Sequence, residues 1–278
     1  MPFLDLDEGR IYYRQQGQGE PIVFVNDWPL SHHYWGPLAH RLRSCFRLIG
    51  FDPRSTGQSR TLVPSAPCDV ETQAEDLHSI ITRLGLGEVH LVGHGLGTVV
   101  AGLCLRVHPQ DVRTLTLITP ILRPEAPEGV NGYVAYAQAV LMLRKLTAVP
   151  LARNLLLRRY SYGRIPSAYR QALLEDFNRV SVSAAWEAIH SATEEETLRR
   201  FAESLTMTKC PVLILACGAD KLSPLETARW IYDRIQTGTL ITLKTHGHFP
   251  MLESPEKIGS LLREFFEKTS PGTGSAVS

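Results

Sequence analysis

The sequence predicts an α/β fold: a mostly parallel sheet covered on both faces, with a helical segment inserted into it. Short apolar, β-branched runs alternate with segments of helical periodicity along most of the chain. Such alternation is typical of parallel, doubly wound sheets. The alternation of strand-like and helical runs stops between residues 121 and 202, where only helical patterns occur. A third observation lies at residues 89–105, where a strand-like run, the glycine turn Gly93-His94-Gly95-Leu96-Gly97 and a helical run follow one another.

Each element is predicted from its own pattern. The clearest helix spans residues 70–84, because Ala74, Leu77 and Ile81 fall on one face and Gly85 follows as a helix-ending residue. Further helices are expected at residues 33–42, 98–105, 225–235 and 255–268. Strands are expected at residues 11–15, 21–25, 47–52, 89–92, 113–119, 210–217 and 239–243.

The break in the alternation predicts three parts of the chain. Residues 1–120 and 203–268 would form the α/β core, and residues 121–202 a helical cap inserted into it. The Leu-rich stretch from Val140 to Leu157 would pack the cap itself or line a substrate pocket beneath it. Residues 269–278 are rich in Gly, Ser and Thr, so we expect a flexible tail.

The bulk properties are those of an ordinary globular chain of 278 residues, of which 44% are hydrophobic and 21% charged. The formal net charge of +1 gives no overall field that would attract nucleic acid or an anionic membrane. No run approaches the roughly 18 apolar residues of a membrane span, and no signal peptide is visible. The five cysteines form no C-x-x-C pair, which favours reduced thiols. We therefore expect a cytoplasmic protein whose partner is a small molecule.

Three candidate site residues lie at predicted strand ends, where ligands bind in parallel sheets. Gly95 occupies the middle of the glycine turn, Asp220 follows the strand at 210–217, and His248 follows the last strand. A strand–turn–helix of the form G-x-S-x-G usually presents a nucleophile at its middle position. The order is therefore nucleophile position, acid, histidine.

Five motifs in chain order carry a resemblance to a known family. They are Asn26-Asp27-Trp28-Pro29, the stretch from Phe51 to Ser59, the glycine turn, Gly218-Ala219-Asp220, and Gly247-His248-Phe249-Pro250 followed by Glu253-Ser254-Pro255. Together they resemble the capped branch of the α/β-hydrolase superfamily, which includes epoxide hydrolases, esterases and C–C hydrolases. The resemblance covers residues 10–268.

The resemblance implies an α/β-hydrolase fold and a role for each matched residue. His248 would be the general base, and Asp220 would fix its tautomer and stabilise the imidazolium. The backbone N–H groups of Trp28 and Leu96 would form the oxyanion hole. Asn26, Asp27 and His94 would border the pocket.

Two departures from the family pattern put its usual chemistry in doubt. Gly95 stands where the family has Ser, Asp or Cys, so no covalent intermediate can form on that residue. Asn26-Asp27 stands where the family has His-Gly. A carboxylate that pointed into the oxyanion hole would oppose a developing oxyanion. We expect Asp27 to point outward, as a turn residue.

Other groups are poor substitutes for the nucleophile. Cys104 and Cys217 fall inside predicted core elements, which favours small buried hydrophobes. Asp27, His32 and His33 invite a metal interpretation, but adjacent histidines point in different directions and no third spaced ligand follows. The glycine spacing G-x-G-x-G is one residue short of a dinucleotide fingerprint. We therefore expect neither a metal nor a cofactor.

Three functions remain open. The first is a cofactor-free enzyme in which the His248–Asp220 dyad acts as general base, for water activation or proton abstraction, on a small and largely apolar substrate. The reaction could then be a hydrolysis or a lyase reaction. The second is a serine hydrolase of the esterase, lactonase or thioesterase type, inactivated by a Ser-to-Gly change at position 95. The third is a non-catalytic binding protein that kept the pocket.

Overall fold

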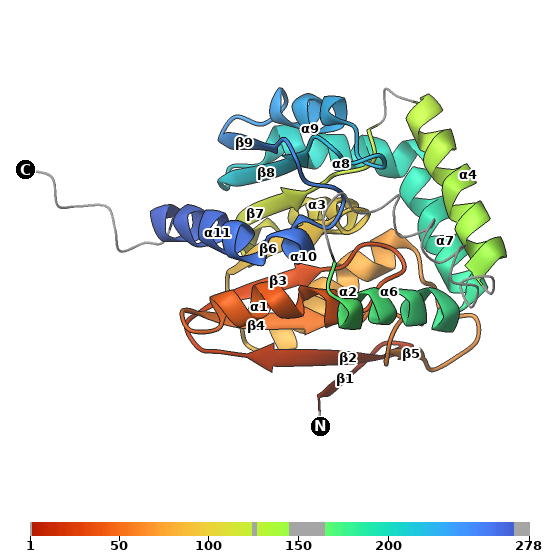
Figure 1. The fold of residues 1–278 in the computed structure, drawn as a ribbon. Coiled ribbons are helices and arrows are strands. Elements are labelled where there is room, and N and C mark those ends of the chain that lie inside the picture. The colour runs from red at the N-terminus through yellow and green to blue at the C-terminus, as the bar shows by residue number, and fades with distance from the viewer. Residues whose placement is uncertain (1, 124–126, 145–164, 270–278) are drawn as a thin grey trace, which may run out of the picture.

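The sheet is the organising element of the fold (Figure 1). The computed structural model of the chain describes residues 2–123, 127–144 and 165–269. Its strands are β1 (Phe3–Leu6), β2 (Gly9–Gln16), β3 (Glu20–Val25), β4 (Phe46–Phe51), β5 (Arg60–Thr61), β6 (Val89–His94), β7 (Val112–Ile118), β8 (Val212–Cys217) and β9 (Gly238–Leu243).

The strands are mostly parallel, as the alternating pattern predicts. In the described part of the chain they form one sheet in the order β1-β2-β4-β3-β6-β7-β8-β9, with β5 paired to β2. All pairs from β4 to β9 are parallel, whereas β2 runs antiparallel to β1, β4 and β5. The central strands β6 and β8 are buried along their whole length. Their continuous apolar runs reflect this cover on both faces.

Helices cover the sheet on both faces. They are α1 (Gly36–Leu42), α2 (Val70–Arg83), α3 (Gly97–Val107), α4 (Pro127–Leu143), α6 (Ser167–Arg179), α7 (Val182–Thr193), α8 (Glu195–Met207), α9 (Leu225–Tyr232), α10 (Pro250–Glu253) and α11 (Pro255–Thr269), with short 3₁₀ turns η1 (His32–Trp35) and η2 (Pro109–Asp111). Figure 1 shows α1 and α11 in front of the sheet and α2 and α3 behind it.

Local signals place the ends of these helices. Asp69 caps α2 by accepting a hydrogen bond from the backbone of Thr72 at 2.7 Å, as an N-cap aspartate does. Gly85 follows with φ of +58° and ends the helix. The helix predicted at 33–42 instead begins as the 3₁₀ turn η1 and becomes α-helical at Gly36. Pro37 lies in the first turn of α1, which its fixed φ favours.

Some elements differ from the sequence prediction. The short edge strands β1 and β5 were not expected, because neither has a long alternating pattern. The helix predicted to run to Ile235 ends at Tyr232. Two predictions fall partly or wholly outside the described residues. These are the tail beyond residue 269 and the part of the Leu-rich stretch that lies within residues 145–164.

Among the described residues between β7 and β8, all regular secondary structure is helical. We call α4, α6 and α7 the inserted helices; Figure 1 shows α4 and α7 side by side at one end of the sheet. The boundary predicted at 202/203 falls inside α8, a continuous helix that packs on α3 of the core. Gly102 of α3 allows this approach, because a Cβ there would overlap the ring of Phe201. Among the described helices, none is both long and apolar enough to cross a membrane.

Candidate active site

The glycine turn connects β6 to α3 and brings backbone groups to the carboxyl edge of the sheet. Gly95 has φ of +55°, a conformation that side chains other than glycine rarely adopt. Gly93 and Gly97 serve packing, since a Cβ on Gly93 would lie 2.6 Å from the carbonyl oxygen of Gly97. A Cβ on Gly97 would overlap the backbone of Asn26. The turn therefore holds β3, β6 and α3 in close contact.

Asp27 occupies the space beside Gly95, and its orientation corrects the sequence prediction. Its side chain points inward and is only 3% exposed. Oδ1 accepts a hydrogen bond from the backbone N–H of Leu96 at 2.8 Å. A Cβ on residue 95 would overlap Oδ1 of Asp27. A side chain at 95 and an inward Asp27 therefore exclude each other, which links the two departures from the family pattern.

His248 lies between two carboxylates. Its Nδ1 is 2.7 Å from Oδ2 of Asp220, and its Nε2 is 3.0 Å from Oδ2 of Asp27. All three side chains are almost completely buried. Asp220 is held in turn by backbone N–H groups of Leu222 and Ser223, at 2.8 and 3.2 Å from Oδ1. The contact between Asp220 and His248 is the one that the sequence led us to expect, whereas the contact with Asp27 was not predicted.

The charges of this trio shift the pKa values of His248 and Asp27. Burial acts to lower the pKa of His248, but the charges and hydrogen bonds of Asp220 and Asp27 outweigh it and raise the pKa to about 10. Burial acts to raise the pKa of Asp27, but the hydrogen bond and charge of His248, together with the Leu96 N–H, lower it on balance. At neutral pH the arrangement is therefore an imidazolium between two carboxylates.

His94, at the end of β6, fixes the position of the His248 loop. Its Nε2 donates to the backbone carbonyl of His248 at 2.7 Å, so its Nδ1 is left to accept from the hydroxyl of Tyr34 at 3.2 Å. Burial lowers the pKa of His94 to about 4, which keeps the ring neutral. The Tyr34 hydroxyl also accepts the backbone N–H of Asp27 at 2.9 Å. No sequence signal pointed to Tyr34, which contributes to the site through tertiary contacts alone.

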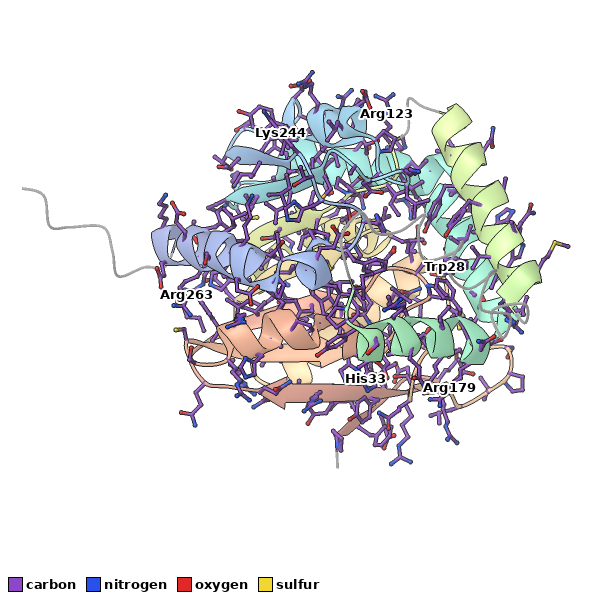
Figure 2. The ribbon with its side chains drawn as sticks, viewed as in Figure 1. Trp28, His33, Arg123, Arg179, Lys244 and Arg263 are labelled. Atoms are coloured by element: carbon purple, nitrogen blue, oxygen red, sulfur yellow. The ribbon has the colours of Figure 1, made fainter. Side chains whose placement is uncertain are left out.

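The two other predicted pocket residues hold the loop after β3. Asn26 donates its amide to the carbonyls of Leu30 and Phe51 at 3.1 and 2.8 Å, and it accepts from the Trp35 indole at 2.9 Å. The Trp28 indole donates to the carbonyl of Ala185 in α7 at 2.7 Å. Figure 2 labels Trp28 where the core faces the inserted helices. These contacts fix the loop that carries Asp27.

A small cavity borders the carboxylate. It has a volume of about 20 Å³ and is lined by Asp27, Trp28 and Leu96 from the core and by Ala185 and Ala188 from α7, among others. A cavity of this size holds about one water molecule when polar groups line it.

The side chains that could hold a metal are already engaged in hydrogen bonds. Asp27, His94 and His248 offer ligand atoms within 4.8 Å of one another, but each of these atoms already has one of the hydrogen-bond partners described above. The metal group considered from the sequence, Asp27 with His32 and His33, does not assemble. Nδ1 of His32 is 2.7 Å from Oδ1 of Asp52, and Asp27 contacts His248 instead. A second group, unrelated to this site, combines His78, His108 and Asp111.

Cys104 and Cys217 offer no alternative nucleophile. Cys104 and Cys217 are buried, and burial raises the pKa of both thiols. A thiol whose pKa is raised carries little reactive thiolate. This agrees with their interpretation as small buried hydrophobes.

The comparison with known families now identifies the fold. The alpha/beta hydrolase family model matches residues 22–259, which is most of the chain. The chain belongs to the alpha/beta hydrolase family. The resemblance stated from five motifs is therefore confirmed.

Curated relatives of this alpha/beta hydrolase cover nearly its whole length. The AB hydrolase superfamily protein YisY of Bacillus subtilis is 28% identical over 266 residues, which cover 92% of this chain and 94% of the relative. The non-heme chloroperoxidase CPO-A1 of Kitasatospora aureofaciens is 35% identical over 281 residues, covering 96% and 100%. An esterase (EaEST) from Exiguobacterium antarcticum superposes with a TM-score of 0.80 at 23% identity, covering 95% and 98%, and shows the fold. The relatives support an enzyme of the hydrolase family.

Proposed function

We propose that this alpha/beta hydrolase is a cofactor-free hydrolase in which Asp27 replaces the missing nucleophile of the glycine turn. One observation carries the proposal. The Asp27 carboxylate lies between the Leu96 N–H and His248 Nε2, in space that only a glycine at position 95 leaves free. A carboxylate is an established nucleophile in covalent catalysis, and the lowered pKa of Asp27 keeps it ionised.

The first step is a displacement on a saturated carbon of the substrate. An Oδ2 lone pair of Asp27 forms the bond to that carbon, and the bond to the leaving group breaks with its electron pair. When the leaving group is the oxygen of an opened epoxide, it takes the proton from Nε2 of His248, which is protonated at neutral pH because its pKa is about 10. A halide leaves as the anion, and Nε2 of His248 then loses its proton to water, because its pKa falls once the charge of Asp27 is gone. In both cases the step ends with an ester on Asp27 and a neutral imidazole.

The second step hydrolyses the ester. Once Asp27 is esterified its charge is lost, so the pKa of His248 falls and its Nε2 can take a proton from water. The water oxygen attacks Cγ, and the charge that develops on Oδ1 faces the Leu96 N–H at the start of α3. The bond between Cγ and Oδ2 breaks, the released alcohol takes a proton from His248, and the Asp27 carboxyl then returns its proton to His248.

This proposal changes the role that we expected for His248 from the sequence. The expected dyad uses His248 as general base from the start, but an imidazolium whose pKa is about 10 is an acid at neutral pH. It becomes a base only after Asp27 has been neutralised. Asp220 keeps the expected function, since it orients Nδ1 and stabilises the imidazolium at 2.7 Å.

We infer that the inserted helices form the cap over this site and select small, largely apolar substrates. Four apolar or aromatic side chains of α4 are buried: Tyr133, Ala137, Val140 and Leu141. Burial and the charge of Asp27 raise the pKa of Tyr133, so its phenol stays protonated. A neutral phenol there can donate a hydrogen bond to a substrate oxygen.

A single-turnover experiment in H₂¹⁸O tests the covalent step. Small apolar epoxides and alkyl halides are first screened for turnover, and an excess of enzyme then converts the best of them once. The alcohol of the first turnover should contain unlabelled oxygen from Asp27, and label should enter it in later turnovers. Full labelling in the first turnover would exclude Asp27 as the nucleophile.

A second route is direct attack by water without an ester. The cavity of about 20 Å³ beside Asp27 and Leu96 favours it, because one water would fit against the carboxylate. In this route Asp27 takes the water proton, His248 protonates the leaving group, and the first turnover is fully labelled.

The two other functions considered from sequence predict different results. An inactivated serine hydrolase should regain activity on Gly95→Ser alone, but any side chain introduced at that position would overlap Asp27. A binding protein without chemistry should return every bound compound unchanged, with no dependence on His248.

A further inference from the structure

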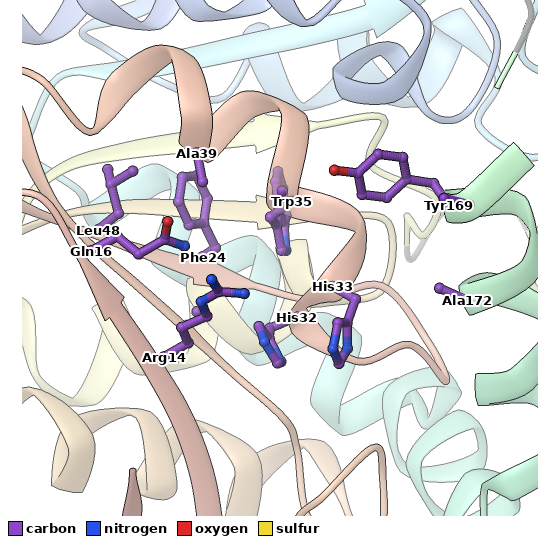
Figure 3. Close-up of a pocket in the computed structure, with 13 residues that line it drawn as sticks. Arg14, Gln16, Phe24, His32, His33, Trp35, Ala39, Leu48, Tyr169 and Ala172 are labelled. Carbon is purple, nitrogen blue, oxygen red and sulfur yellow. The ribbon is translucent and has the colours of Figure 1, made fainter. Parts of the chain in front are cut away.

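A groove with its own set of lining residues lies between β2, η1 and α6 (Figure 3). It has a volume of about 310 Å³, which is the size of a pocket for a small molecule. Residues of β2, β3, β4, η1 and α1 form one side, and Ala168, Tyr169 and Ala172 of α6 form the other. Asp27, His94 and His248 do not line it.

Most of the groove lining is apolar. Phe24 and Trp35 stack with ring centroids 4.7 Å apart, and Ala39 and Leu48 extend this surface. Gly36 makes room for the Tyr169 hydroxyl, because a Cβ there would lie 2.8 Å from that oxygen. This surface would bury the hydrocarbon part of a ligand.

His32 gives the groove an unsatisfied polar group. Its side chain is only 6% exposed. Nδ1 is 2.7 Å from Oδ1 of the fully buried Asp52, whereas Nε2 has no hydrogen-bond partner within the described chain. A buried polar atom without a hydrogen-bond partner destabilises the folded protein. A ligand in the groove would satisfy it.

The charged groups of the groove favour an anion. Figure 3 shows the Arg14 side chain extending from β2 toward the His32 ring, and Arg14 makes no ion pair with a described residue. His33 also lines the groove, but burial and the neighbouring His32 lower its pKa, so its ring is neutral and Arg14 is the cation of the groove. No lining residue is an aspartate or glutamate. An arginine fork is the side chain that best matches a carboxylate.

We propose that this groove is a binding site for a small amphipathic monocarboxylate. The Arg14 guanidinium and the His32 Nε2 bind the carboxylate, and the surface around Phe24 and Leu48 buries the apolar body. His32 contacts Asp52 through Nδ1 and donates to the ligand carboxylate through Nε2. The site is independent of the Asp27 chemistry, because that carboxylate would repel the same ligand.

Calorimetry with phenylacetate as the probe, and phenylacetamide as its neutral counterpart, tests the site on the full chain. We expect phenylacetate to bind at least about 10-fold more tightly than the amide, as a charge-assisted pair requires. Equal affinities, or no phenylacetate binding at roughly 10 mM, would overturn the proposal.

Three variants locate the binding. Arg14→Gln, at an exposed position, should weaken phenylacetate binding about 10-fold, and Ala172→Trp should fill the groove and abolish it. Arg10→Gln is the matched control, since Arg10 lies on the same strand but pairs with Asp5 outside the groove. Asp27→Asn should leave the affinity unchanged. Wild-type affinity in Arg14→Gln, or a change in Asp27→Asn, would place the ligand elsewhere and contradict the assignment.

Discussion

The glycine turn of residues 93–97 and the loop of residues 26–30 meet at the site but contribute to it in opposite ways. At the nucleophile position the turn supplies only backbone, because Gly95 has no side chain and Leu96 offers its N–H. The loop supplies the carboxylate of Asp27, which accepts that N–H and contacts His248. In the family pattern the turn carries the reactive side chain. The comparison teaches that the space beside His248 can be filled from either segment, but not from both.

The largest effect is expected when the loop loses its charge. Asp27→Asn keeps the shape but removes the nucleophile, so kcat should fall by about 10³-fold or more. Turnover of the epoxide or halide found by screening measures this. The variant should also fold, since the amide oxygen can still accept the Leu96 N–H. Retention of more than a tenth of wild-type kcat would contradict the role of Asp27.

The next effect comes from giving the turn a side chain. Gly95→Ala places a Cβ against Asp27 at a backbone φ of +55°, so the free energy of unfolding should fall by about 2–4 kcal/mol. Urea denaturation measures the change.

The control is the double variant Asp27→Gly/Gly95→Ala, which removes the overlap. Its free energy of unfolding should exceed the value expected from the sum of the single effects, as coupled neighbours require. Strict additivity of the two changes would show that the segments do not compete for this space.

The contributions of His248 and Asp27 to stability depend on pH in opposite directions. The pKa of His248 rises from 6.5 when unfolded to about 10 when folded, so its contribution is complete below pH 6.5 and is lost as the pH rises toward 10. The pKa of Asp27 is lowered, so its contribution is present above 3.8 and is lost in acid. Melting temperatures measured from pH 4 to 10 should therefore fall at the alkaline end.

Asp27→Asn should weaken that alkaline fall, because one of the two charges that hold the His248 proton is gone. NMR of the His248 imidazole should show a lower pKa in the variant than in the wild type. An unchanged pKa would mean that Asp220 alone sets the protonation of His248.

The smallest effects distinguish two neighbouring histidines. His94→Gln weakens the contact to the His248 carbonyl, so kcat should fall about 10-fold through misplacement of the imidazole. His246→Gln should change kcat less than about 2-fold. The polar contact of the His246 ring is with Ser254, whose Oγ lies 3.0 Å from Nε2, and not with Asp27, Asp220 or His248. Comparable losses of kcat in the two variants would contradict the prediction that His94 positions the His248 imidazole.

The sequence predicted the framework because its signals are local. The run of Val89 to Val92, the glycine turn and the helix that follows could be read in order, and Asp220 and His248 follow strands whose ends meet at one edge. The short strand β5 has too little pattern for prediction. The predicted boundary at 202/203 falls inside α8, because α8 is one helix whose contact with α3 is not visible in its own residues.

The sequence by itself determined the fold, the pairing of Asp220 with His248 and the absence of a side chain at position 95. Only the tertiary structure decided where the Asp27 carboxylate points, which charges surround His248 and what Tyr34 contacts. The physical reason is that strand and helix patterns record burial along one segment. The direction of a loop side chain depends on space and hydrogen bonds supplied by residues far apart in the chain, here Gly95, Leu96 and His248.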